Sequence, residues 1–152
     1  MTANLPILKV QVLPHGEGLD LPAYETALSA GMDLRAAVDA PVLVGSMERR
    51  AIPTGLAMAI PAGFEGQVRP RSGLALRRGL SMPNSPGTID ADYRGELKVL
   101  VINLGSEPIE ITRGMRIAQL LICPVAQAQI TLVDDLDSTV RGTGGFGSTG
   151  LS

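Results

Sequence analysis

Residues 55–69, GLAMAIPAGFEGQVR, contain two short runs of β-forming residues, 55–60 and 64–69, on either side of a Pro-Ala-Gly turn. Runs of about four to eight such residues, bounded by Gly, Pro or Asn, are typical of β-strands. The pattern recurs along the chain at residues 8–12, 41–44, 96–103 and 116–122. Prolines are spread along the chain and break most long helices. The sequence therefore predicts many short strands.

We predict an all-β fold, a jelly-roll-like barrel or sandwich. The 152 residues suffice for one domain with its own core, and 18 glycines and 11 prolines favour many turns. With two Tyr, two Phe and no Trp, aliphatic side chains must fill that core. One helical turn is expected at residues 73–78, with Ser72 capping its N-terminus. We assign residues 1–140 to this domain and the Gly-rich residues 141–152 to a flexible C-terminal arm.

Charge and composition exclude several classes of protein. A net charge of -2 has the wrong sign for a protein that coats nucleic acid. No apolar run approaches the roughly 18 residues of a membrane span, and residues 1–8 contain no basic residue and no long apolar stretch. The single cysteine, Cys123, allows no disulfide within the chain, which fits a reducing compartment. We expect a cytoplasmic protein without a nucleic acid or membrane partner.

The C-terminal stretch RGTGGFGSTG, residues 141–150, has the composition of a phosphate-binding loop. Its glycines and hydroxyl residues present backbone N–H groups, and Arg141 adds a guanidinium. It is not a Walker A loop, because it has no Lys and no helix follows it. Phe146 suggests stacking on a nucleobase. The alternative, a solvated terminus, leaves this aromatic residue unexplained.

Two internal stretches also have the residue types of a binding site. In PRSGL, residues 70–74, an Arg and a Ser at a helix start suit an anion, or they form a plain N-cap with a surface Arg. In NSPGTIDADYRGE, residues 84–96, an extended strand would place Asp90 and Asp92 on one face, able to bind a cation or activate water. A polar hairpin is the alternative. The lone His15 is not expected to be catalytic.

These stretches, in this order, resemble the trimeric dUTP diphosphatase (dUTPase) family, which has five short motifs. The matching segments are AGMDL at 30–34, PRSGL at 70–74, GTIDADYRGE at 87–96, GMRIAQ at 114–119 and RGTGGFGSTG at 141–150. They span residues 30–150, and five motifs in family order are highly specific.

The resemblance implies a β jelly roll that forms a homotrimer, with Mg²⁺ as cofactor and active sites shared between subunits. It implies hydrolysis of dUTP to dUMP and diphosphate, by attack of water on the α-phosphorus. That reaction keeps uracil out of DNA and supplies dUMP for thymidylate synthesis.

The resemblance also assigns roles to individual residues. Asp90 would orient or deprotonate the water, Tyr93 would pack under the deoxyribose, and Asp33 would place Mg²⁺ indirectly, through its waters. The C-terminal arm would close over another subunit's site, with Phe146 stacked on uracil. The residues expected to contact substrate are Arg71, Ser72, Gly73, Asn84, Thr88, Ile89, Asp90, Tyr93, Lys98, Gln119, Arg141, Phe146, Gly147, Ser148 and Thr149.

Two alternatives to this function remain. The related deoxycytidine triphosphate deaminases share the fold and the phosphate site, but they are not expected to combine the DADY sequence at 90–93 with a Phe-Gly-Ser tail. A catalytically idle jelly roll that binds nucleotides or a protein partner is the second alternative, and an intact Asp90 argues against it.

Overall fold

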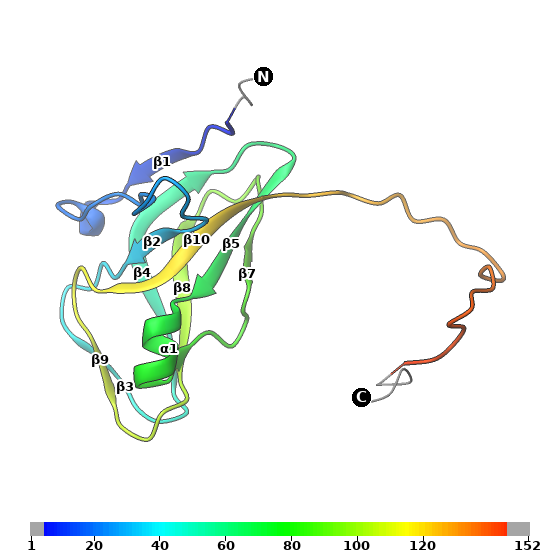
Figure 1. Ribbon diagram of the computed structural model, residues 1–152. Coiled ribbons are helices and arrows are strands. Elements are labelled where there is room, and N and C mark those ends of the chain that lie inside the picture. The colour runs from blue at the N-terminus through cyan, green and yellow to red at the C-terminus, as the bar shows by residue number, and fades with distance from the viewer. Residues whose placement is uncertain (1–4, 146–152) are drawn as a thin grey trace.

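The computed structural model describes residues 5–145 of the chain. Its elements are β1 (Lys9–Val12), the short 3-10 helix η1 (Pro14–Gly16), β2 (Met32–Arg35), β3 (Val42–Val44), β4 (Arg49–Ala59), β5 (Phe64–Pro70), α1 (Ser72–Arg78), β6 (Leu80–Ser81), β7 (Gly87–Ile89), β8 (Glu96–Asn103), β9 (Ile109–Ile111) and β10 (Arg116–Pro124). They gather into one β body with α1 at its side (Figure 1). No helix in this part of the chain is long and apolar enough to cross a membrane.

Antiparallel sheets form this body. One four-stranded sheet has the order β1-β4-β8-β6, another has the order β2-β10-β5-β7, and β3 pairs with β9. Strand β8 alternates: Leu97 and Val99 are buried, whereas Lys98 is exposed. Val68 and Leu120, from the second sheet, belong to the same buried cluster. The aliphatic core therefore lies between the two sheets, and the predicted all-β, jelly-roll-like fold is confirmed.

The predicted strands agree with the structure, with one clear difference. Strand β8 covers the predicted residues 96–103, but β4 begins at Arg49 and not at residue 55. Pairing with β8 continues from Arg49 through Pro53, and a register shift between Pro53 and Ala57 interrupts it. A bulge lets a strand tolerate proline, which does not donate to the ladder. Four further strands were not predicted, and each has only two to four residues: β2, β6, β7 and β9.

The helical turn was predicted in the right place with the wrong cap. Arg71 is the N-cap residue and has an extended backbone, so Ser72 is already the first helical residue, and no side chain caps the end. Gly79 ends the helix in the left-handed conformation, with φ of 73°, and its N–H donates to the carbonyl of Ala75. A Cβ at Gly79 would lie 2.4 Å from the backbone nitrogen of Gly105, so the close approach also requires glycine there.

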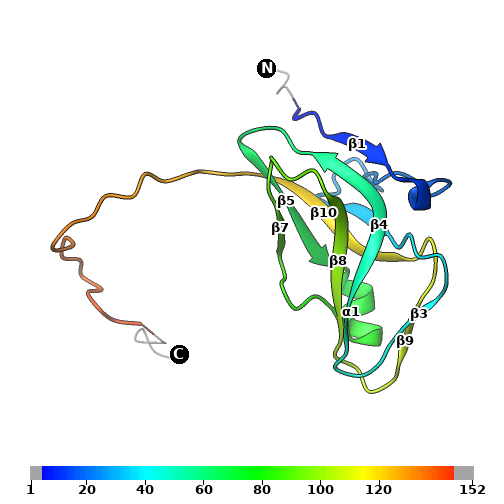
Figure 2. The same ribbon diagram turned by 180° about the vertical axis from the view of Figure 1, so that it is seen from behind.

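The segment after β10 leaves the β body. Residues 125–145 contain no helix or strand and are exposed almost throughout. Figures 1 and 2 show this segment extending away from the sheets in both views. The division of the chain at residue 140 stays a prediction, while the last strand already ends at Pro124.

Candidate active site

A pocket between β7 and β8, which we call the β7–β8 pocket, collects most of the predicted nucleoside-binding residues. Its cavity of about 420 Å³ is large enough for a small ligand. Of the residues predicted to contact substrate, six line it: Asn84, Thr88, Ile89, Asp90, Tyr93 and Lys98. The sequence reading did not select the remaining lining residues, Glu96, Leu97 and Leu100.

The turn that follows β7 shapes this pocket. Strand β7 ends at Ile89, and the N–H of Tyr93 donates to the carbonyl of Asp90 at 3.1 Å. The expectation that Asp90 and Asp92 share one face of an extended strand is therefore wrong, because the chain turns between them. The Tyr93 hydroxyl donates to the carbonyl of Glu96 at 3.0 Å, which fixes the ring across the turn.

Glu96 is a wall residue of the pocket with three basic or donor groups around its carboxylate. Nε2 of His15 lies 2.6 Å from Oε1, and the N–H of Gly55 donates to the same oxygen at 3.0 Å. Nζ of Lys98 lies 3.8 Å from Oε2. Burial raises the pKa of Glu96, but the two hydrogen bonds and the charges of His15 and Lys98 outweigh it and lower the pKa below its ordinary value of 4.5. The carboxylate is held in its ionised form.

A second concave site, which we call the Asp33 cradle, lies where β2, β10 and the start of α1 meet. Its lining residues are Glu25, Ser29, Ala30, Gly31, Asp33, Arg71, Ser72, Gly73, Leu74, Arg77, Arg116 and Gln119. Five of them were predicted as substrate or metal residues: Asp33, Arg71, Ser72, Gly73 and Gln119. Asp33 and Gln119 lie on adjacent strands, because Gln119 of β10 is the register partner of Asp33 in β2.

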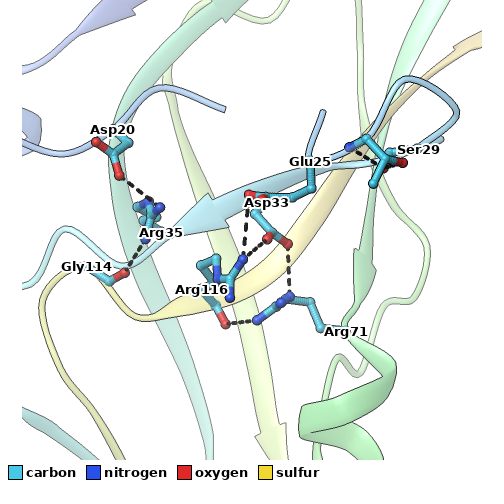
Figure 3. Close-up of polar contacts among 9 residues, drawn as sticks. Asp20, Glu25, Ser29, Asp33, Arg35, Arg71, Gly114 and Arg116 are labelled. Atoms are coloured by element: carbon cyan, nitrogen blue, oxygen red, sulfur yellow. Dashed lines mark hydrogen bonds and ion pairs between the residues drawn. The ribbon is translucent and has the colours of Figure 1, made fainter. Parts of the chain in front are cut away.

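Two arginines converge on the Asp33 carboxylate (Figure 3). Nε of Arg71 lies 2.9 Å from Oδ1, and Nη1 of Arg116 lies 3.0 Å from Oδ2. Arg116 also lies 3.5 Å from a Glu25 oxygen, and Arg71 donates to the Arg116 carbonyl. The Asp33 side chain is 15% exposed, whereas those of Arg71 and Arg116 are 29% and 41% exposed. Both guanidinium groups therefore reach solvent at a site suited to an anion.

Sequence reasoning placed Arg116 inside a motif but did not select it. Arg116 of β10 pairs with Arg35 of β2, and the register of the two strands shifts before Ala118. A sequence pattern does not reveal such an irregularity. Gly31 has a local role in the same place, because a Cβ there would lie 2.5 Å from the Gln119 side-chain oxygen. Gln119 in turn donates to the Pro70 carbonyl at 3.0 Å. Gly31, Pro70 and Gln119, which come from three different motifs, are thus packed or hydrogen-bonded together.

The predicted arm residues lie apart from both sites or outside the described chain. Arg141 is exposed on the extended segment, where its Nε donates to the Gly144 carbonyl at 2.8 Å. Phe146, Gly147, Ser148 and Thr149 lie outside the described residues.

The two sites share no lining residue. Within the sheet of order β2-β10-β5-β7, Asp33 is on one edge strand, and Thr88 and Ile89 are on the other. Three steps between neighbouring strands amount to roughly 14 Å. One chain therefore presents a nucleoside-sized pocket and an arginine-lined cradle at separate places.

The all-β fold and these two sites are those expected of a jelly-roll-like nucleotide-binding protein. Residues 17–150 match the family model described as dUTPase. The chain is 59% identical over 149 residues to the deoxyuridine 5'-triphosphate nucleotidohydrolase of Sinorhizobium medicae, covering 97% of this chain and 93% of that protein. It is 61% identical over 150 residues to the protein of the same name from Maricaulis maris, covering 97% and 98%.

Solved structures agree with these relatives. The Staphylococcus bacteriophage 80alpha dUTPase with dUPNHPP is similar to this chain with a TM-score of 0.86 and 27% identity, covering 95% of this chain and 99% of that one. A variant of the same phage enzyme with dUpNHpp gives a TM-score of 0.83 at 28% identity, with the same coverage. The chain belongs to the dUTPase family, and the prediction that it is an enzyme of this class is confirmed.

Proposed function

We propose that the protein hydrolyses dUTP to dUMP and diphosphate, a reaction that keeps uracil out of DNA and supplies dUMP for thymidylate synthesis. One observation supports this most: the β7–β8 pocket brings Asn84, Asp90 and Tyr93 to a single nucleoside-sized cavity. The names of the relatives support the same substrate.

In the proposed reaction, Asp90 holds a water molecule against the α-phosphorus and takes its proton. The water oxygen forms the new bond to phosphorus, the bond from the α-phosphorus to the bridging oxygen breaks, and diphosphate leaves. Asp90 is exposed in the pocket, so its carboxylate is accessible to water and substrate. A positioned carboxylate of this kind contributes about 10²–10⁴ in rate.

The walls of the pocket would select the nucleoside. The segment that includes Asn84, Thr88 and Ile89 would read uracil, largely through backbone groups. The Tyr93 ring, fixed by its bond to the Glu96 carbonyl, would pack under the deoxyribose and leave no room for a 2′-hydroxyl. Lys98, on the wall of β8, would contact the nucleotide.

The Asp33 cradle would hold the triphosphate. Arg71, with Ser72 and Gly73, supplies a guanidinium, a hydroxyl and backbone donors, and Gln119 closes the side of β10. Arg141, Gly147, Ser148 and Thr149 of the arm would grip the β- and γ-phosphates while Phe146 stacks on uracil. A closing arm of this kind excludes water from the reaction.

The residues of the cradle fit a magnesium ion that keeps its waters. Among residues 5–145, no group of three or more His, Cys, Asp or Glu side chains could hold a metal ion. Mg²⁺ commonly binds through one or two carboxylates, substrate phosphates and water, and Asp33 lines the cradle with each carboxylate oxygen paired to an arginine, which leaves contact through water as the way it would serve the ion. Asp33 would hold the ion through its waters, and bound Mg²⁺ would neutralise charge on the phosphate oxygens.

We propose that each active site is assembled between subunits of a homotrimer. Substrate must occupy a nucleoside pocket and a phosphate cradle at once, and within one chain these share no lining residue and lie toward opposite edge strands of one sheet. The cradle of one subunit would therefore face the β7–β8 pocket of another, and the C-terminal arm would add the last contacts.

Diphosphate release from dUTP, dTTP, dCTP and UTP, each with and without a chelator, tests the proposal. We expect release from dUTP with Mg²⁺, little release from the other three nucleotides, and loss of activity with chelator. Equal rates on all four nucleotides would refute the substrate assignment. Ammonia release from dCTP would point to the deaminase alternative.

A further inference from the structure

Glu96 connects three segments of the chain beside the β7–β8 pocket. Its side chain, 15% exposed, accepts from His15 in η1 and from the backbone N–H of Gly55 in β4. Its backbone carbonyl accepts from the Tyr93 hydroxyl. One residue therefore links the N-terminal turn and the β4 bulge to a ring that lines the β7–β8 pocket.

The segments that meet at Glu96 are tightly fitted. A Cβ at Gly16 would lie 2.4 Å from the Gly55 carbonyl oxygen, and Leu13 donates to that carbonyl at 2.8 Å. A Cβ at Gly95 would lie 2.4 Å from the Tyr93 hydroxyl. The Tyr93 ring thus lies directly against the backbone that leads into Glu96, and a shift of Glu96 moves the support of the ring.

We infer that Glu96, held by His15, is a positioning residue that fixes Tyr93 against the sugar and so determines discrimination between dUTP and UTP. The inference rests on the proposed function, which supplies the role of Tyr93. It adds that the sugar selectivity depends on a carboxylate and an imidazole that need not touch the nucleotide.

The charged groups around this pair are consistent with positioning. Lys98 faces Glu96 from the same strand, and Arg113 donates to the backbone carbonyls of His15 and Glu17, so it holds the η1 turn in place. Hydrogen bonds to a charged group are stronger than those between neutral groups, which makes the ionised Glu96 an effective anchor.

The experiment compares Glu96→Ala, Glu96→Gln and His15→Ala with wild type. For Glu96→Ala we expect the dUTP/UTP ratio of kcat/KM to fall about tenfold, mainly through a higher kcat/KM for UTP, with kcat for dUTP within about threefold of wild type. Gln keeps an acceptor of the same size, so Glu96→Gln should restore most of the ratio. His15→Ala, which leaves Glu96 its bond to Gly55, should give a smaller loss.

A matched control is Glu48→Ala. Glu48 also accepts from a backbone N–H, that of Gly45 at 2.8 Å, and pairs with Arg50, but it lines neither site. We expect its nucleotide ratio to equal that of wild type. Equal dUTP/UTP ratios in Glu48→Ala and Glu96→Ala would refute the inference. Equal ratios in Glu96→Ala and Glu96→Gln would refute it as well.

A second readout needs no substrate. The chain has two tyrosines, so a Tyr24→Phe background leaves Tyr93 as the single source of tyrosine ring resonances in an NMR spectrum. We expect these to shift in Glu96→Ala and His15→Ala and to stay near wild type in Glu96→Gln and Glu48→Ala. Unchanged resonances in Glu96→Ala would overturn the positioning role. If wild type released no diphosphate from dUTP, the proposed function would fail, and the resonances would still decide the position of Tyr93.

Discussion

The Asp33 cradle and the β7–β8 pocket are organised by different interactions. In the cradle, ion pairs from Arg71 and Arg116 hold a carboxylate from two sides. In the pocket, a turn and a hydroxyl-to-carbonyl bond place Tyr93, and the exposed Asp90 stands at the turn. On the proposed function, the cradle would bind phosphates through ion pairs, whereas the pocket would select the nucleoside by its shape.

This difference predicts separable defects. Loss of a cradle arginine should weaken binding of the phosphates, since each guanidinium acts on charge that is already present in the substrate. Loss of Asp90 should affect the chemical step, because its role begins when water attacks. The two regions can therefore be tested one against the other.

The largest effect is expected for Asp90→Asn. Asn keeps the size of the side chain but does not accept a proton, so kcat should fall about 10³-fold while affinity for a non-hydrolysable dUTP analogue changes little. Single-turnover kinetics and calorimetric titration measure the two quantities. Asp92→Asn, in the same turn, is the matched control and should retain most of its activity. A variant Asp90→Asn with normal turnover would remove Asp90 from the chemistry.

Arg71→Ala should give the next largest effect, and mainly on binding. Removal of its guanidinium leaves Asp33 paired with Arg116 alone, and kcat/KM for dUTP should fall about 10²-fold with most of the loss in KM. Arg50→Ala is the control for the loss of one surface charge, because Arg50 pairs with Glu48 and lines neither site. Equal KM values in the two variants would mean that the cradle does not bind phosphate.

Mixing these two impaired variants, and assaying them at dUTP concentrations far below the KM of Arg71→Ala, sharpens the comparison further. If each site combines Asp90 of one subunit with Arg71 of another, random trimers of Asp90→Asn and Arg71→Ala chains should recover about a quarter of the wild-type sites. Activity is measured after joint refolding at a ratio of one to one. Separately refolded samples, mixed afterwards, serve as the control. No recovery would show that pocket and cradle act within one chain.

The sequence predicted the long elements and the composition of both sites better than their local geometry. Strand β8 follows a clear alternation, so residues 96–103 could be predicted to the residue. The three residues of β7 carry too little pattern, and the turn after it separates Asp90 from Asp92. Turn conformation depends on bonds such as the one from the Tyr93 N–H to the Asp90 carbonyl, which composition alone does not determine.

Contacts between side chains far apart in the sequence could not be predicted from the sequence either. His15 and Glu96 are 81 positions apart, and the lone histidine gave no sign of its partner. Arg116 and Asp33 are 83 positions apart and meet only because β10 pairs with β2. The motifs identified residues that belong to the sites, whereas the sheet order determined that they form two groups.

The smallest effect is expected from Glu96→Gln on stability in acid. The folded state lowers the pKa of Glu96 below 4.5, so in acid the unfolded chain binds more protons than the folded one at this residue. The stabilisation from its ionised carboxylate is complete above that ordinary value and is lost as pH falls through the folded pKa. The difference in free energy of unfolding between wild type and Glu96→Gln should therefore be constant near neutral pH and shrink on acidification. Urea titrations across this range measure it. A His15→Ala background should reduce the pH-dependent part, because it removes one of the two hydrogen bonds that hold the carboxylate ionised, and a difference independent of pH would contradict the lowered pKa.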